Sequence, residues 1–234
     1  MTSQNISQIL RRLADPIGAT QSQRFFKTGK GEYSEGDQFL GIRVPVLREQ
    51  AKIFEGTPLP EIQNLLESPF HEERLCALLM LVRKFTKGTP EEQTHIYTLY
   101  LENTQYINNW DLVDLSAYHI VGPYLEHRDR HPLHKLAHSK SLWERRIAII
   151  STFHFIKNNR FEETLGISEQ LLNDSEDLIH KAVGWMLREI GKRDLETEEA
   201  FLKSHYKQMP RTMLRYAIEK FPEPKRQKYL KGFI

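Results

Sequence analysis

The sequence predicts an all-α protein, an α-solenoid built from repeated helical hairpins. Apolar residues recur at helical spacing along almost the whole chain, and no alternating strand with a hairpin turn is present. Five apolar stretches align on a common alanine at intervals of 40, 31, 34 and 35 residues: Ala77, Ala117, Ala148, Ala182 and Ala217. A small residue at this period suits hairpins whose helices approach closely. A helical bundle is the alternative.

The expected helices cover residues 4–14, 18–28, 44–54, 59–67, 70–86, 90–103, 108–126, 131–139, 141–157, 161–173, 176–191, 197–208, 210–221 and 225–231. Thr89, Ser175 and Thr197 are the expected N-caps of three of them. Residues 29–43 hold four glycines and are expected to be irregular. N-terminal helices within 1–55, about five hairpins over 58–222 and a short basic helix in 225–234 then make up one domain, 1–234, because solenoid repeats bury their faces only against neighbours.

Composition indicates a globular protein. The 234 residues are 39% apolar and 27% charged, and no apolar run is long enough for a transmembrane helix. The N-terminal residues lack the apolar segment of a signal peptide, so we expect a cytoplasmic protein. Cys76 is the single cysteine, and its apolar neighbours predict a buried core thiol rather than a nucleophile.

Charge is unevenly distributed, although the net charge is only +2. Residues 200–234 contain nine Lys and Arg against two Glu, whereas residues 1–199 carry a net charge of −5. A basic end of this kind indicates a polyanionic partner. An ordinary solvated charged helix is the alternative.

One stretch, NNWDLVDLSAYHIVG at residues 108–122, places a carboxylate among apolar residues. If the stretch is one helix, a single stripe holds Trp110, Asp114, Ala117 and Val121. A buried carboxylate costs several kcal/mol unless it is paired or hydrogen-bonded. Asp114 is therefore either a structural acid, paired with Arg145 or Arg146, or a functional group.

Further unusual residues collect on the second helices of the predicted hairpins, which we expect to line an inner, concave side. These positions carry all three tryptophans, several cations and the one carboxylate: Trp110, Asp114, Trp143, Arg145, Arg146, Lys181, Trp185, Arg188, Arg211 and Arg215. Cations beside exposed aromatic rings suit a nucleic-acid backbone. Because phosphate repels a carboxylate, Asp114 belongs in this line only if it faces something positive. An ordinary core position is the alternative for each tryptophan.

The sequence indicates neither a metal site nor a catalytic nucleophile. His127, His131, His134 and His138 share one helical face, but no carboxylate accompanies them at ligand spacing. The His-Glu pair of FHEERL, residues 70–75, lacks the second histidine of a zinc motif. We expect no metal and no cofactor.

Five motifs together resemble one known family, over nearly the whole chain. They are FLGIRVPVLR (39–48), NWDLVD (109–114), LWERRIAII (142–150), KAVGWMLREIG (181–191) and MPRTMLRYAIEKFP (210–222). In order and on this repeat frame, they resemble the AlkD-type DNA glycosylases of the DNA alkylation repair enzyme family, which are built from HEAT-like repeats.

The resemblance implies a curved solenoid that holds duplex DNA in a basic concave cleft and excises N3- and N7-alkylated purines. Matched by motif, Asp114 is the catalytic carboxylate, Trp110 and Trp185 are the cleft tryptophans, and Arg146 binds a phosphate. Where the family's N-terminal helix presents a Tyr to DNA, this chain offers Phe25 or Phe26. Further expected DNA contacts are Trp143, Arg145, Lys181, Arg188, Arg211 and Arg215.

We therefore expect a monofunctional alkylpurine DNA glycosylase that acts as a monomer on duplex DNA. A non-catalytic binder of damaged or branched DNA and a protein-interaction solenoid are the alternatives. Asp114 favours the enzyme, because a binder gains nothing from a carboxylate among phosphates. No lysine in an apolar setting is evident for a Schiff base, so we expect no lyase activity.

Overall fold

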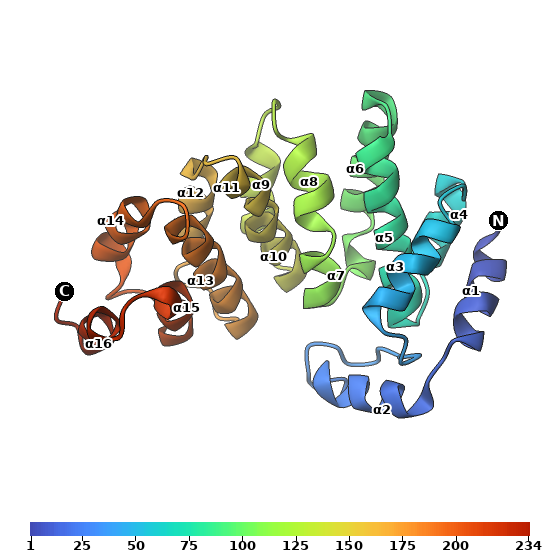
Figure 1. Cartoon of the computed structure of the whole chain (residues 1–234), viewed down its shortest axis with the longest axis horizontal. Helices are drawn as coiled ribbons and strands as arrows, with labels where there is room; N and C mark the ends of the chain where they lie inside the picture. Colours follow the sequence, from blue (N-terminus) through green and yellow to red (C-terminus); the bar gives the residue numbers. More distant parts are fainter. The chain divides into compact units, whose positions relative to one another are not determined.

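A computed structural model describes all 234 residues and confirms the all-helical class (Figure 1). The only strand-like feature is an isolated bridge between Gln38 and Phe70. The chain divides into two compact units, Met1–Ile120 and Val121–Ile234. None of the helices combines the length and apolar character needed to cross a membrane.

The first unit contains the N-terminal helices and the first hairpins. Its elements are α1 (Ser3–Arg12), α2 (Pro16–Phe25), α3 (Val44–Ile53), α4 (Leu59–Leu66), α5 (His71–Lys87), α6 (Pro90–Glu102), a 3₁₀ turn η1 (Thr104–Tyr106), α7 (Trp110–Asp114) and the start of α8 (Ala117–Tyr124). Within this unit, α2 runs across the direction of the other helices (Figure 1).

The second unit continues the same hairpin pattern. Its elements are the end of α8, α9 (His131–Ala137), α10 (Leu142–Ser151), α11 (Phe153–Lys157), α12 (Glu162–Gln170), α13 (Asp177–Gly191), α14 (Leu195–His205), α15 (Arg211–Ala217), a 3₁₀ turn η2 (Ile218–Lys220) and α16 (Glu223–Lys231). Helices α9 and α10, α12 and α13, and α14 and α15 occupy the predicted hairpins.

The repeated small residue has the predicted environment. The five aligned alanines are at most 1% exposed. Helices α13 and α15 approach so closely that a Cβ added to Gly184 would lie only 2.4 Å from the carbonyl oxygen of Met213. Cys76 is fully buried, and burial raises the pKa of its thiol to about 12, as expected for a core residue.

Helix starts agree only in part with the sequence signals. Thr89 caps α6 through a complete capping box, in which its hydroxyl and the Glu92 carboxylate each accept the other residue's backbone N–H. The other two predicted caps are wrong. Asp194, three residues before Thr197, caps α14, and α13 begins after Glu176 rather than Ser175.

The predicted helix 108–126 is broken, which corrects the single stripe predicted for Trp110, Asp114, Ala117 and Val121. Helix α7 ends at Asp114 and α8 begins at Ala117. At the break, the Ser116 hydroxyl donates to the Leu112 carbonyl at 2.6 Å and is bonded to the Tyr100 hydroxyl at 2.8 Å. A side chain that bonds the backbone in this way competes with regular helix. Asp114 is consequently half-buried at a helix end, not in an apolar stripe.

Two other long predicted helices are interrupted as well. The 141–157 helix breaks at Thr152, whose hydroxyl donates to the Ile149 carbonyl at 2.7 Å. The 210–221 helix tightens into η2 after Ala217. The glycine-rich 29–43 segment is irregular as predicted. Gly41 adopts a φ of +79°, and a Cβ added there would lie 2.2 Å from the Asp15 carbonyl oxygen, so only glycine fits.

Candidate nucleic-acid interface

The predicted site residues fall into one group in each unit. Phe25, Phe26, Trp110 and Asp114 belong to the first unit, and Trp143, Arg145, Arg146, Lys181, Trp185, Arg188, Arg211 and Arg215 belong to the second.

Trp110 opens α7 and is half-buried against the aromatic pair that ends α2. Its indole stacks on Phe26, with ring centres 5.3 Å apart and planes 25° from parallel. Phe25 meets the same indole edge-on at 5.9 Å and is 66% exposed. The structure thus brings both phenylalanines to Trp110 and separates their positions: Phe26 supports the indole, and Phe25 presents its ring to solvent.

Asp114 lies one helical turn after Trp110, so the two side chains emerge on the same side of α7. Its carboxylate lies within electrostatic reach of Tyr100 and Tyr118. Burial raises the pKa of both phenols, and the negative charge of Asp114 raises it further. The exposed Arg48 of α3 opposes this effect at Tyr118. Asp114 therefore sits in a partly desolvated setting that contains polar and aromatic groups.

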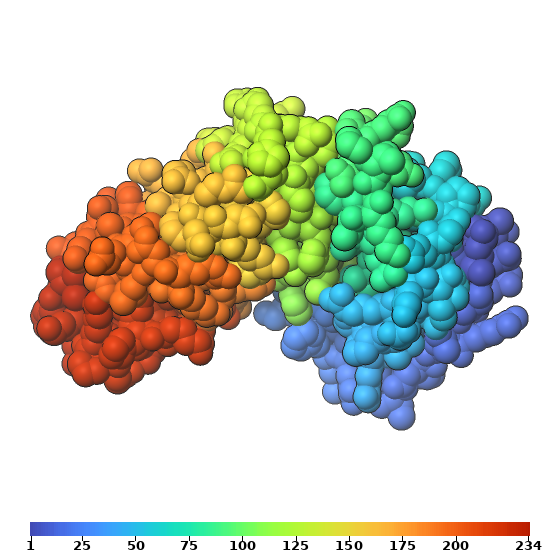
Figure 2. Space-filling view, turned by 45° about the horizontal axis from the view of Figure 1, so that its top comes forward, coloured from blue at the N-terminus to red at the C-terminus, as the bar shows by residue number.

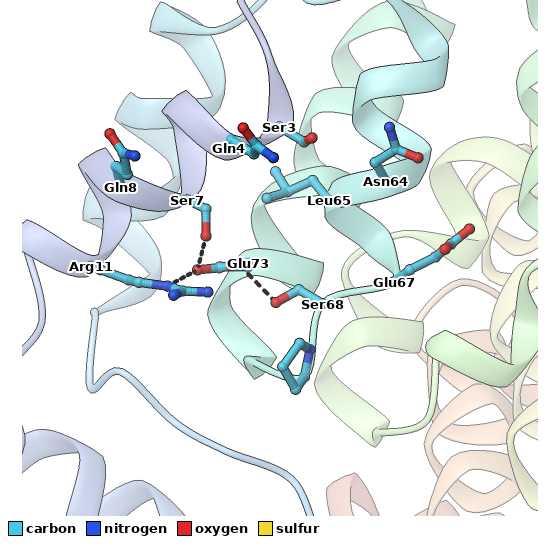
Figure 3. Close-up of a pocket in the computed structure, with 11 residues that line it drawn as sticks. Ser3, Gln4, Ser7, Gln8, Arg11, Asn64, Leu65, Glu67, Ser68 and Glu73 are labelled. Carbon is cyan, nitrogen blue, oxygen red and sulfur yellow. Dashed lines mark hydrogen bonds and ion pairs between the residues drawn. The ribbon is translucent and has the colours of Figure 1, made fainter.

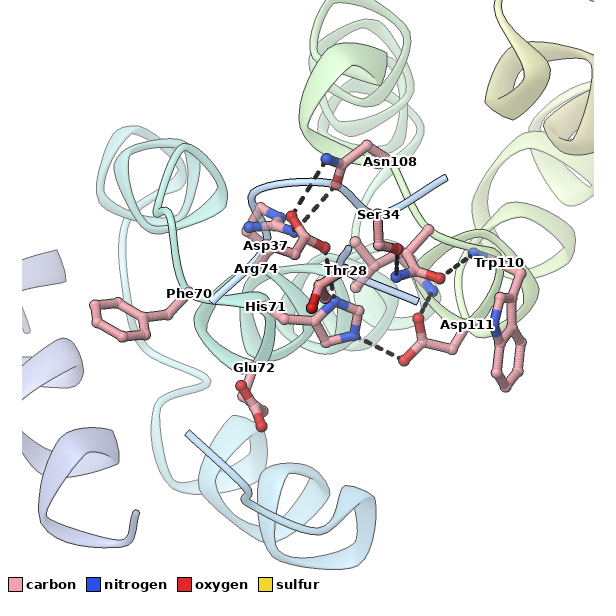
Figure 4. Close-up of polar contacts among 12 residues, drawn as sticks. Thr28, Ser34, Asp37, Phe70, His71, Glu72, Arg74, Asn108, Trp110 and Asp111 are labelled. Carbon is pink, nitrogen blue, oxygen red and sulfur yellow. Dashed lines mark hydrogen bonds and ion pairs between the residues drawn. The ribbon is translucent and has the colours of Figure 1, made fainter. Parts of the chain in front are cut away.

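Helix α7 has only five residues, so contacts from outside the helix must orient it. The fully buried Asn109 caps the helix by accepting from the Trp110 backbone N–H at 2.8 Å. The Asn109 amide also donates to the Ser34 hydroxyl at 2.6 Å. The irregular 29–43 segment therefore fixes the start of α7 (Figure 4).

Four consecutive polar residues at the start of α5 are buried, although a helix N-terminus usually faces water. Glu72 accepts the backbone N–H groups of Leu40, Gly41 and Ile42. Glu73 accepts from Ser7, Arg11 and Ser68. Arg74 donates to Asp37 at 2.8 Å and to Asn108 at 3.0 Å, while His71 lies between Asp37 and Asp111 (Figure 4). These four residues fasten α1, the 29–43 segment and α7 to α5.

Burial by itself lowers the pKa of His71, but the carboxylates of Asp111 and Asp37 outweigh it and raise that pKa to about 9. Burial raises the pKa of Asp37, but His71 and Arg74 together bring it below its usual value. The cluster is therefore charged at neutral pH: His71 and Arg74 are cationic, and Asp37 is a carboxylate.

In the second unit, α13 presents three predicted residues on one face. Lys181, Trp185 and Arg188 are all half-buried on a single unbroken helix, as their spacing predicted. The Trp185 indole N–H donates to Glu189 at 3.2 Å, and its ring lies 6.1 Å from that of Phe153. Lys181 pairs with Asp177 at 2.8 Å.

The two arginines of α10 differ in their surroundings. Arg145 pairs with Asp174 through two nitrogens, at 2.6 and 3.2 Å, and also donates to the carbonyls of Ser139 and Lys140. Arg146 is only 5% exposed and donates to the Leu178 carbonyl at 2.5 Å. Trp143, on the same helix, is half-buried. Arg145 thus acts as a brace between α10 and the turn before α13.

The last predicted cations lie at the end of the second unit. Arg188 is paired with Glu219, and Arg211 donates to the Leu230 carbonyl at 2.6 Å. Arg215 is exposed and forms no ion pair. Residues 200–234, in orange-red to red in Figure 2, lie together on the surface and include the further exposed lysines Lys203, Lys207, Lys228 and Lys231.

One cavity, in the first unit, contains none of these residues. It measures about 440 Å³ and is lined mainly by hydroxyl, amide and charged side chains of α1 and the α4–α5 hairpin (Figure 3). A cavity of about 380 Å³ lies beside Phe25 and is also lined by Gln21 and Arg43. No group of three His, Cys, Asp or Glu side chains is arranged to hold a metal ion.

Comparisons with known proteins identify the family and the fold. The family described as DNA alkylation repair enzyme matches residues 6–221. A solved structure described as a predicted DNA alkylation repair enzyme from Enterococcus faecalis shares 17% identity and a TM-score of 0.69, over 90% of this chain and 97% of that one. The structure of smu.31 from Streptococcus mutans UA159 shares 15% identity and a TM-score of 0.53, over 94% of this chain and 99% of that one.

The search of curated proteins finds no match. At these identities the two solved structures show the fold alone, and they agree with the predicted α-solenoid class. The family match covers most of the chain and includes every motif singled out in the sequence except the final residue of MPRTMLRYAIEKFP. The chain belongs to the DNA alkylation repair enzyme family.

Proposed function

We propose that the chain is a monofunctional DNA glycosylase that hydrolyses the N-glycosidic bond of cationic N3- and N7-alkylated purines in duplex DNA. One observation carries the proposal. In a chain of a DNA alkylation repair family, a half-buried carboxylate, Asp114, and a supported indole, Trp110, lie one turn apart on a short helix. An anion beside an aromatic face suits a cationic sugar and base better than it suits phosphate.

The proposed chemistry follows from the charge of the lesion. An N3- or N7-alkylpurine already carries a positive charge, so the base can leave with the electrons of the C1′–N bond without prior protonation. The sugar then develops oxocarbenium character, which Asp114 stabilises by opposite charge, a contribution of roughly 3–4 kcal/mol for a preorganised group. Water adds to C1′ and gives its proton to Asp114 or solvent, which leaves a free base and an abasic site.

Aromatic and cationic side chains have separate proposed roles. Trp110 packs against the deoxyribose and the cationic lesion, where cation–π attraction reaches about 2 kcal/mol when desolvated. Trp185 is proposed as a second aromatic contact to the DNA. Arg146 anchors a phosphate of the lesion strand, with Trp143, Lys181, Arg188, Arg211 and Arg215 as further DNA contacts. We leave Arg145 out of these contacts, because Asp174 and two carbonyls engage its guanidinium.

Selectivity in this scheme comes from the charge and weakened bond of the lesion. No constellation of side chains in the proposed site is suited to read the edge of a base, so the base need not enter a pocket. Bulky cationic adducts should therefore be accepted alongside methylated purines.

The test is base release from duplex DNA treated with a methylating agent. We expect free 3-methyladenine or 7-methylguanine in the supernatant, a matching count of aldehyde-reactive abasic sites, and no strand breaks. Release of unmodified bases, or strand scission that accompanies base loss, would contradict the proposal. Tight binding of the same DNA without release would favour the non-catalytic binder instead.

A further inference from the structure

We infer that His71 is a positioning residue for Trp110: its ring lies between the carboxylates of Asp37 and Asp111, packs in the aromatic cluster that supports the indole, and so fixes the orientation of α7. This inference rests on the proposed function. His71 is 2% exposed and cannot touch DNA, so any effect on the reaction passes through its neighbours.

The first link is ionic. His71 Nε2 lies 2.9 Å from Asp111 Oδ2, and Nδ1 lies 3.5 Å from Asp37 Oδ2. Only the imidazolium, which carries a proton on each nitrogen, can donate to both carboxylates. Asp111 is the residue next to Trp110 in the first turn of α7. The position of the imidazolium therefore sets the position of the backbone that carries the indole.

The second link is a cluster of aromatic rings. His71, Phe39 and Phe26 contact one another, with ring centres 4.6 to 5.1 Å apart, and Phe26 stacks on Trp110 at 5.3 Å. The ring planes lie 15° to 35° from parallel, and His71 reaches the indole through Phe26 alone as well as through Phe39. A change in the tilt of His71 is passed on to the indole through close-packed rings.

The charged neighbours of His71 determine whether its ring is protonated. The charged groups that face His71 are Asp111 on α7, Asp37 in the irregular segment and Arg74 on α5, and the two acids prevail. Because the pKa of His71 is raised, its contribution to stability is fully present below the unfolded value of about 6.5 and is lost as pH rises through about 9. His71 therefore bridges Asp37 and Asp111 as an imidazolium at neutral pH, and it loses this charge in alkaline solution.

The test is fluorine NMR of the full chain labelled with 5-fluorotryptophan, in the absence of DNA. The Trp110 resonance is assigned as the one that is missing from the spectrum of Trp110→Phe. We expect this resonance to move between pH 7 and 10 in the wild type, and to be displaced and pH-independent in His71→Gln. Asp111→Asn should displace it in the same way and serves if His71→Gln fails to fold. The control is His154→Gln, which removes a half-buried histidine from Glu126 in the other unit and should leave the resonance in place.

Single-turnover base release is measured on the same samples. His71→Gln should slow base release about 10- to 100-fold, because a small misplacement of the indole reduces the rate of the chemical step. The Kd for DNA should change less than about threefold. A variant that keeps both the wild-type resonance and the wild-type rate overturns the inference. A wild type that releases no base overturns the proposed function alone, since the resonance still decides whether His71 positions the indole.

Discussion

At the scale of single residues, Trp110 depends on side chains that are remote in sequence. Phe26 supports one face of the indole, and Phe25, its neighbour, is two-thirds exposed beside it. The resemblance placed a Tyr of the family at this point of the chain. Phenylalanine loses the hydroxyl but keeps the ring, so the supporting role needs no polar group, and Phe25 is the ring available for stacking on DNA.

Truncation of each ring separates these two roles. Phe26→Ala should cost about 2–4 kcal/mol of unfolding free energy and slow base release at least about tenfold, because the indole loses its support. Phe25→Ala should change stability by less than about 0.5 kcal/mol and weaken DNA binding instead. Urea unfolding and fluorescence anisotropy measure the two effects. Equal effects of both variants on stability would show that the rings do not have separate roles.

The candidate residues were predictable from sequence to very different degrees. Trp110 and Asp114 belong to a local motif, so both could be named, and Phe25 and Phe26 could be narrowed to a pair. The cluster around His71 could not be found. Its acids, Asp37 and Asp111, lie 34 and 40 residues from His71, and only tertiary packing pairs them. The one available signal was a run of four polar residues at the start of a strongly apolar helix.

At the scale of elements, the hairpin pattern was predictable and the breaks within helices were not. Apolar periodicity and the five alanines locate the hairpins because burial imposes both. The breaks at Ser116 and Thr152 depend on hydroxyls that bond to nearby carbonyls, and a serine or threonine inside an apolar run is equally compatible with an unbroken helix. In the proposed function the break after Asp114 matters, because it places the carboxylate at a helix end.

Close helix approach gives a test at this scale. Gly184→Ala should destabilise the chain by about 1–3 kcal/mol, because the added Cβ meets the Met213 carbonyl and the Tyr216 side chain within 2.5 Å. The matched control is Gly166→Ala in α12, where the nearest atom is 3.9 Å away. That variant should gain up to about 1 kcal/mol of helix propensity. A thermal melt in which both variants shift Tm in the same direction would contradict the assigned packing of α13 on α15.

At the scale of the whole molecule, the uneven charge has a structural counterpart. Several cations of the second unit are used internally, among them Arg145 with Asp174 and Arg160 with Glu126. Others, including Arg215 and the lysines of the 200–234 surface, remain exposed. Exposed, unpaired cations contribute most to the attraction of a polyanion, whereas Arg145, held by Asp174, mainly holds helices together.

The salt dependence of DNA binding distinguishes these two classes of arginine. Arg215→Gln should weaken binding and reduce the slope of log K against log salt by about 0.9, the effect of one lost phosphate contact. Arg145→Gln should leave that slope unchanged and cost about 3 kcal/mol of stability, because Asp174 is left buried without its partner. Titrations at several salt concentrations measure the slope. A reduced slope in Arg145→Gln would show that Arg145 does contact a DNA phosphate.

The central claim, that Asp114 is the catalytic carboxylate of a glycosylase, is tested most directly by single-turnover base release from methylated duplex DNA with Asp114→Asn. Asp129→Asn, which removes an exposed carboxylate before α9, is the matched control. We predict that Asp114→Asn binds DNA as well as the wild type but releases base at least about 100-fold more slowly, whereas Asp129→Asn keeps the wild-type rate. Release by Asp114→Asn at the wild-type rate would contradict the account.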